Sequence, residues 1–292
     1  KPKDVTPDMA KWDRNARKLY SGQFVRNFTE GELLFGKVVH DQLQTPDTWE
    51  VALSSGADKK ETFTRLMVEN QLGDLAFLRN LRNMRDAGVD RSTIESYGDS
   101  LKWGRVLPFR FIAAARVVPD YEPMLERWML KCLEGAQKLT ARTALVIDVS
   151  GSMQERLSAK SDLTRIDAAK ALAMLLREIC SEIDVFVFNT KTGLVPARRG
   201  FALGDAIGNP NGGTDARQAV HAIQQHGEYS RLIMLTDEQS FSSLPDPQQL
   251  GYVINVAAHQ NGIGYGKWLH IDGWSETVID YITKHESTNA DA

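Results

Sequence analysis

Cysteine is scarce in this chain: Cys132 and Cys180 are the only two among 292 residues. Two isolated cysteines build no disulfide framework, and they lack the paired spacing of a zinc site. Long apolar runs are also missing, since none approaches the roughly 20 residues that a membrane-spanning helix needs. We therefore expect a protein of the reducing cytoplasm with no membrane association.

Basic charge is not in excess either. The formal net charge of −3 argues against a uniformly basic nucleic-acid-binding protein. Charged residues make up 25% of the chain and hydrophobic residues 42%, which is the balance of an ordinary globular protein. The length allows two domains. Because the first residue is Lys1, we expect the sequence to begin inside a longer protein.

Residues 143–153, TALVIDVSGSM, change abruptly from apolar to polar at Asp148. A short apolar block of this kind is typical of a buried parallel strand, and ligands of open α/β sheets bind just beyond the carboxyl ends of such strands. Asp148, Ser150 and Ser152 offer three hard oxygen ligands on one tight turn, which Gly151 permits. Such donors suit Mg²⁺ or Mn²⁺. The alternative interpretation is an Asp/Ser cap of the helix that follows.

Two later segments favour the metal interpretation. Thr214 lies in a glycine-rich loop, and a second apolar strand at 232–235 ends in Thr236 and Asp237. Both strands therefore bring an aspartate to their carboxyl ends. The ordered set D-x-S-x-S, Thr and T-D resembles the metal-ion-dependent adhesion site of von Willebrand factor A domains. The resemblance implies a divalent ion, Mg²⁺ or Mn²⁺, held by Asp148, Ser150, Ser152, Thr214 and Asp237.

Residues 1–141 have the pattern of a helical domain. Apolar positions recur at spacings of three and four residues, with short polar turns between them. Helix pairs without a fixed period favour irregular HEAT-like repeats. We expect helices at 30–42, 59–70, 74–87, 107–118 and 122–136.

Residues 142–292 form the second predicted domain, in which strands alternate with helices. This alternation predicts a doubly wound, mostly parallel sheet of the Rossmann-like type. Besides the strand that opens at Thr143, we expect strands at 182–188, 193–198, 231–235, 252–258 and 268–271. We expect helices at 162–180, 215–225 and 275–284.

Basic residues gather in the first domain. Arg79, Arg82 and Arg85 lie three apart on the 74–87 helix, and Lys102, Arg105, Arg110 and Arg116 follow among Trp103, Phe109 and Phe111. Arginines beside aromatic rings suit phosphate contact combined with base stacking, so these seven basic residues are candidate RNA ligands. The alternative is a solvated helix face above a packed aromatic core.

Four short motifs resemble those of one family, the Ro (TROVE-module) ribonucleoproteins. Residues 236–241, T-D-E-Q-S-F, are similar to that family's T-D-N-E-T-F, and residues 148–153, D-V-S-G-S-M, to its D-V-S-x-S-M. In the helical half, L-R-N-L at 78–81 matches, and L-P-F at 107–109 resembles H-P-F. The motifs follow the family's order over nearly the whole chain.

The resemblance implies a non-enzymatic RNA-binding protein of RNA quality control, built as HEAT-like repeats closed by a von Willebrand A domain. Members bind small noncoding Y RNAs on the outer surface, and they accept single-stranded 3′ ends of misfolded RNAs in a central hole. Bacterial members can be tethered by Y RNA to an exoribonuclease, polynucleotide phosphorylase. An acidic protein ligand at the metal is a further implied partner.

Two other functions compete with RNA binding. A metal-dependent hydrolase could use Mg²⁺ with the carboxylates, but in the sequence no histidine flanks the three metal motifs, and the serines lie outside any G-x-S-x-G elbow. A purely protein-binding adhesion module would accept a partner's Glu or Asp at the metal and would show no RNA affinity.

Overall fold

The computed structural model describes residues 47–104, 106–134, 137–159, 161–239, 243–257, 266–273 and 277–290. The chain divides into two compact units, Lys1–Asp58 and Lys59–Ala292. In the first unit the described part holds α3 (Trp49–Ser54), which Thr48 caps through its side chain. The helix expected at 30–42 lies outside the described residues.

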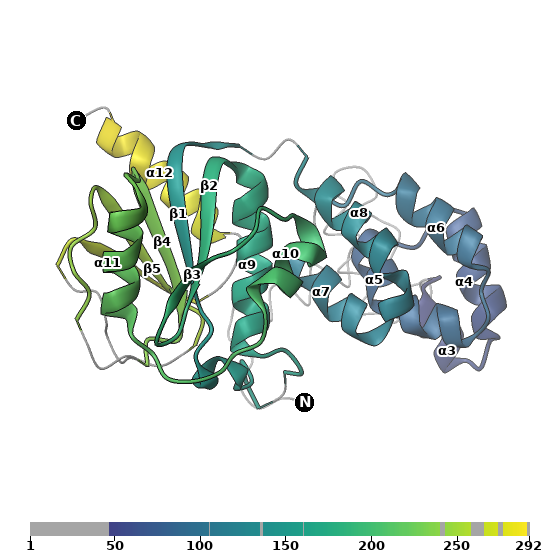
Figure 1. Ribbon diagram of the computed structural model, residues 1–292. Coiled ribbons are helices and arrows are strands. Elements are labelled where there is room, and N and C mark those ends of the chain that lie inside the picture. Colours follow the sequence, from purple (N-terminus) through teal and green to yellow (C-terminus); the bar gives the residue numbers. More distant parts are fainter. Residues whose placement is uncertain are drawn as a thin grey trace, which may run out of the picture. The chain divides into compact units, whose positions relative to one another are not determined.

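The second unit begins with five α-helices within the described residues (Figure 1). They are α4 (Lys59–Val68), α5 (Asp74–Asp86), α6 (Arg91–Ser100), α7 (Pro108–Val117) and α8 (Glu122–Cys132). Four of them confirm the expected helices to within a few residues, whereas α6 was not predicted. The sequence RSTIESYGDS of α6 buries only Ile94, Tyr97 and Gly98, so its apolar stripe is too thin to stand out.

An aromatic cluster forms the centre of this helical layer. The indole rings of Trp103 and Trp128 stack with centroids 5.4 Å apart, and Phe77 meets Trp128 edge-on at 5.6 Å. Helix α6 passes so close that a Cβ on Gly98 would lie 2.1 Å from Cζ2 of Trp128. Glycine is therefore required at this contact, because any larger side chain would overlap the indole ring.

The remaining chain builds one sheet. Its described strands are β1 (Leu139–Asp148), β2 (Cys180–Phe188), β3 (Thr192–Leu194), β4 (Arg231–Thr236), β5 (Leu250–Asn255) and β6 (Trp268–Asp272). Their order is β3-β2-β1-β4-β5-β6, and every pairing is parallel except that of β3 with β2. This confirms the predicted doubly wound fold. Strand β1 begins just before the expected domain boundary at Arg142.

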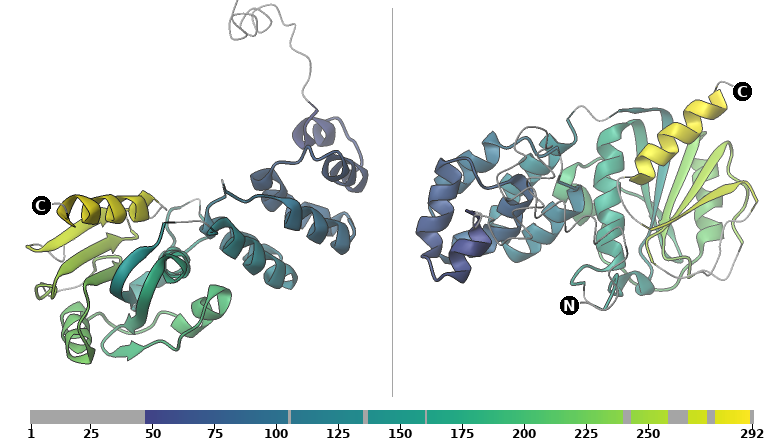
Figure 2. Two further views of the ribbon diagram at one scale, coloured as in Figure 1. Left: turned by 90° about the horizontal axis from the view of Figure 1, so that it is seen from above. Right: turned by 180° about the vertical axis from the view of Figure 1, so that it is seen from behind.

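Helices cover both faces of this sheet. On one face α9 (Arg165–Ile179), α10 (Gly200–Ile207) and α12 (Thr277–Ala290) enclose a buried aliphatic cluster. Seen from behind, α12 lies across the same face as α9 (Figure 2). On the other face α11 (Ala216–His226) packs over β1, β2 and β4. Helix α10 was not expected from the sequence.

A buried arginine fastens α12 to the sheet. Arg231, which opens β4, is 2% exposed and donates to both carboxylate oxygens of Glu286 on α12. The same guanidinium reaches the carbonyl of Thr140 at 3.2 Å and the hydroxyl of Thr143 at 2.8 Å on β1. One side chain thus connects the last helix with two central strands.

The helical layer packs on the sheet's helices within the same unit. Helix α7 contacts α9, and α8 contacts α10. Arg116 of α7 pairs with Asp167 of α9, and Glu126 of α8 accepts a hydrogen bond from the Phe201 backbone at 2.8 Å. Among the described helices, none combines the length and apolar character needed to cross a bilayer.

Candidate metal centre and basic groove

The first candidate site lies where β1 and β4 end side by side. The sheet extends from β1 through β2 in one direction and from β4 through β5 in the other, so this is the switch point at which open α/β sheets bind ligands. Asp148 is the last residue of β1, and Asp237 directly follows Thr236 at the end of β4. All three are fully buried.

Asp148 is held by hydrogen bonds at both carboxylate oxygens. The backbone N–H of Ser150 donates to Oδ1 at 2.8 Å, and the Thr236 hydroxyl donates to Oδ2 at 2.8 Å. Burial raises the pKa of Asp148 to about 6 against the effect of these bonds, and the charge of Asp237 raises it further. A nearby cation would favour the ionised carboxylate and lower this pKa.

The two predicted serines lie together in the first loop. Their hydroxyl oxygens are 3.2 Å apart. Ser150 precedes a short 3₁₀ helix, η2 (Gly151–Gln154), but its side chain makes no capping bond there. Helix α9, the next α-helix, is capped by Thr164. The helix-cap interpretation of these serines therefore has no support in the geometry.

The glycine-rich loop that carries Thr214 is bonded to the first loop. Gly151 N–H donates to the Gly212 carbonyl at 3.0 Å, and Asn211 N–H donates to the Val149 carbonyl at 2.7 Å. Gly212 has φ +74°, a conformation that favours glycine. Half-exposed Thr214 follows two residues later. The three predicted loops thus lie close together at the carboxyl ends of the strands.

Arg165 completes this site, and the sequence alone did not reveal it. Its guanidinium is 4% exposed and donates from Nη1 to Asp237 Oδ2 at 2.7 Å and to the Ser152 carbonyl at 3.3 Å. In the sequence, Arg165 is one basic residue near the start of the helix expected at 162–180. Nothing in the sequence shows that its partner lies far along the chain.

The donor set fits a divalent ion of the Mg²⁺ class. Within the described residues no three His, Cys, Asp or Glu side chains cluster as metal ligands. The candidate centre instead combines two carboxylates with hydroxyls, which are hard oxygen donors. An ionised carboxylate has about four lone-pair positions, so the hydrogen bonds at Asp148 and Asp237 leave room for a metal bond.

His270 also lies nearer this site than its sequence position suggested. Its Nδ1 is 2.9 Å from Oε1 of Glu238, which is 2% exposed and follows Asp237 directly. The strand β6 that carries His270 is separated from β4 by β5. Only the folded sheet therefore brings this histidine beside the third motif.

The candidate RNA ligands separate into two groups in the structure. Arg85 pairs with Asp86 and Asp120, and Arg116 pairs with Asp167 and donates to the Asp162 carbonyl at 3.0 Å. These two arginines hold helices together. Lys102 is exposed, and Arg105 lies outside the described residues.

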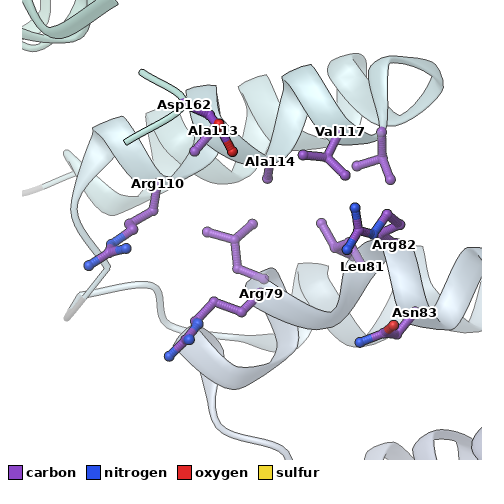
Figure 3. Close-up of a pocket in the computed structure, with 11 residues that line it drawn as sticks. Arg79, Leu81, Arg82, Asn83, Arg110, Ala113, Ala114, Val117 and Asp162 are labelled. Carbon is purple, nitrogen blue, oxygen red and sulfur yellow. The ribbon is translucent and has the colours of Figure 1, made fainter. Parts of the chain in front are cut away.

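The other group lines one groove between α5 and α7, here named the α5–α7 groove. Its volume is about 310 Å³, and Arg79, Arg82 and Arg110 stand around walls of leucine, alanine and valine. Figure 3 shows Arg79 and Arg110 reaching from facing helices toward the same side of the groove. In the described part of the chain, none of the three forms an ion pair. Arg110 lies over the Phe109 ring, 4.8 Å from its centre.

The aromatic neighbours behave as a packed core rather than as base platforms. Trp103 and Phe111 are both 0% exposed, and the Trp103 indole N–H donates to the Gly98 carbonyl at 2.8 Å. The prediction that they stack on bases is therefore wrong for these two. Phe109 is half-buried beneath Arg110.

Comparison with known proteins identifies the family. Residues 36–183, half of the chain, match the TROVE domain. The chain belongs to the TROVE domain family. Within this TROVE protein, Asn80 of the L-R-N-L motif is 1% exposed and donates to the Ala76 carbonyl at 2.9 Å. Pro108 of L-P-F is the first residue of α7, where proline is well tolerated.

One solved structure shows the same fold. The crystal structure of the Deinococcus radiodurans Ro (RSR) protein aligns with a TM-score of 0.60 at 17% identity, covering 96% of this TROVE protein and 63% of the Deinococcus chain. The present chain thus spans less than two thirds of that protein. BatB of Bacteroides thetaiotaomicron, a conserved hypothetical protein, aligns at 13% identity with a TM-score of 0.36, over 52% of this chain and 100% of its own. No curated protein matches.

Proposed function

We propose that this TROVE protein binds RNA and that the α5–α7 groove contacts the phosphate backbone. The observation that supports this most directly is that Arg79, Arg82 and Arg110 line one groove and form no ion pair within the described part of the chain. Several other arginines of the helical layer are paired with carboxylates; Arg127, for example, pairs with Glu95 and Asp99. Asp162 is the one acidic residue of the groove lining, so three arginines leave the groove with an excess of positive charge that an anion would neutralise.

The expected ligand is RNA with an unpaired stretch. Flexible single strands can follow a groove between two helices, and their phosphates suit the planar guanidinium fork. Arg110 is held over the Phe109 ring, which leaves its outer face available to a base. We therefore propose single-stranded 3′ ends and small noncoding Y-type RNA as ligands, in RNA quality control. An exoribonuclease such as polynucleotide phosphorylase would join through the RNA.

The RNA proposal is tested with the double variant Arg79→Ala/Arg82→Ala in the full-length protein. Affinity should fall for every RNA sequence, and the slope of log affinity against log salt should flatten by about 0.7 for each phosphate that the variant no longer neutralises. Arg217→Ala is the matched control, because Arg217 is an exposed arginine of α11 whose side chain forms a hydrogen bond to the Ser243 hydroxyl and no ion pair among the described residues.

The substrates for this test are a hairpin RNA with a single-stranded 3′ tail and the same hairpin with a blunt end. The tailed RNA should bind more tightly to the unmodified protein. Wild-type affinity and slope in the double variant would remove α5 from the RNA path. Crosslinking to cellular RNA, followed by sequencing, identifies the natural ligand.

The converged loops support a second proposed role, divalent-metal binding. Asp148, Ser150, Ser152, Thr214 and Asp237 would hold Mg²⁺ or Mn²⁺, and the bound ion would offer an open position to an acidic side chain of a partner protein. The centre is proposed to bind rather than to catalyse, because both carboxylates are fixed by hydrogen bonds to neighbouring groups. A metal-dependent adhesion module without RNA affinity is the alternative function.

Asp148→Asn tests the metal role. The amide keeps the size of the carboxylate but only one of its two acceptor oxygens, so its NH2 group must donate to the Thr236 hydroxyl instead of accepting from it. Because a buried charge is removed at the same time, the metal-free variant should stay folded at neutral pH. Mg²⁺ and Mn²⁺ binding measured by calorimetry should be lost. Unchanged metal affinity in this variant would contradict the assignment. RNA binding by a variant that no longer binds metal would contradict the alternative, a metal-dependent adhesion module without RNA affinity.

A further inference from the structure

The outer edge of the sheet is only partly covered. Strand β3 pairs with residues 186–188 of β2, and the last bond of this pairing runs from Val195 N–H to the Val185 carbonyl at 2.8 Å. Pro196 follows, and proline has no N–H to continue the ladder. The first half of β2 therefore lies beyond the reach of β3.

Ile183 presents its backbone at this open edge. Phe188 directs its carbonyl toward the β1 side and Val185 directs its carbonyl toward β3, so even-numbered residues of β2 face β1 and odd-numbered ones face outward. Ile183 is odd-numbered. Within the described residues, its outward N–H and C=O have no hydrogen bond outside the β1–β2 pairing.

A cavity of about 300 Å³ lies directly beside this edge. Its apolar lining comes from both sides of the gap between β2 and α10, and it includes Ile183, Val185, Val195 and Leu203. Leu194 at the rim is 54% exposed. An apolar side chain from outside would be removed from water here, at roughly 25 cal/mol for each Å² that it buries.

Two arginines flank the cavity without carboxylate partners. Arg177 and Arg198 both line it, and neither forms an ion pair with any part of the chain that the structure describes. The next residue, Arg199, does form an ion pair, with Glu178. Asp184 also lines the cavity, but its Oδ2 already accepts from Arg142 at 2.7 Å and from the Tyr229 hydroxyl at 2.8 Å. Among the described residues, the charges at this rim that have no partner of opposite sign are therefore positive.

We propose that this edge binds an extended acidic peptide of a partner protein. The peptide would add as a strand beside Ile183, place one apolar side chain in the cavity, and direct Asp or Glu side chains to Arg177 and Arg198. Alternate side chains of a strand point the same way, so an apolar residue flanked by acids satisfies both features. Open backbone groups favour a peptide over RNA, since strand addition uses main-chain N–H and C=O groups.

The test uses a phage-displayed library of random linear peptides selected on the intact chain. The expected sequences contain a large aliphatic or aromatic residue with Asp or Glu nearby. A labelled synthetic copy of the best peptide is then titrated by fluorescence anisotropy. Arg177→Glu/Arg198→Glu should weaken it at least tenfold, and Arg198→Glu alone, at an exposed position, should do so in part. Ala197→Trp, at an exposed position of the cavity lining, should block the cavity.

Reciprocal controls separate this site from the RNA groove. Arg79→Ala/Arg82→Ala should leave peptide affinity unchanged, and Arg177→Glu/Arg198→Glu should leave RNA affinity unchanged. Slower hydrogen exchange at the Ile183 amide on peptide binding would support strand addition. Failure to select any peptide, selection of peptides insensitive to the charge reversal, or loss of RNA binding in that variant would each overturn the proposal.

Discussion

Arg165 places a permanent positive charge where the candidate metal centre needs a cation. Its Nη1 lies 2.7 Å from Oδ2 of Asp237, and both side chains are almost completely buried. The same guanidinium also pairs with Glu155, so Arg165 offsets only part of the negative charge of Asp148, Asp237 and Glu155. Arg165 would therefore lower the affinity of the centre for a divalent ion, because its positive charge neutralises part of the negative charge of the carboxylates.

Arg165→Met tests this arrangement. Without magnesium the variant should lose about 3–5 kcal/mol of unfolding free energy, because a buried carboxylate is left unpaired. Added Mg²⁺ should recover part of the loss, since the metal supplies the missing cation. Urea unfolding with and without Mg²⁺ measures both values. An equal loss in both conditions would show that the ion does not reach Asp237.

At the scale of elements, the close contact of α6 with Trp128 predicts that a larger residue in place of Gly98 destabilises the protein, although helix propensity alone favours the replacement of glycine by alanine. Gly98→Ala would place a methyl group against an indole that already stacks on Trp103 and meets Phe77. Overpacking of this kind costs roughly 1–3 kcal/mol. Thermal unfolding should show the loss. Gly104→Ala is the control, because a Cβ there has no neighbour within 4 Å.

The elements also show how far the sequence could predict this fold. Buried parallel strands such as β4 are uninterrupted apolar runs, so they and the aspartates at their ends were identifiable. Helix α10, GFALGDAI, has glycine at two of its eight positions, and its pattern resembles a loop. Ion-pair partners such as Asp120 for Arg85 and Asp237 for Arg165 depend on contacts between distant segments. The periodicity of apolar residues in the sequence does not indicate which residues form such pairs.

At the scale of the molecule, the sheet carries its own core. The fully buried residues of the clusters on its two faces all come from Leu139 onward, and from the preceding segment Leu133 adds a partly buried contact. We therefore expect residues 137–292 to fold without the helical layer, with a cooperative thermal transition followed by circular dichroism. A fragment that starts at Arg142 should be less stable, because it lacks buried Leu139 and the Thr140 carbonyl that Arg231 binds. An unstructured longer fragment would show that α7 and α8 complete this core.

A pulling force on the C-terminal helix would reach the middle of the sheet first. Glu286 of α12 is bonded to Arg231, and Arg231 in turn is bonded to β1 through Thr140 and Thr143. Glu286 also accepts a hydrogen bond from Tyr252 of β5 at 3.1 Å, so tension on α12 is transmitted to the inner strands β1, β4 and β5 rather than to the edge strand β6. A force applied to the C-terminal end of this helix would therefore act on the strands that carry the candidate metal centre before it separates the edge strand β6 from the sheet.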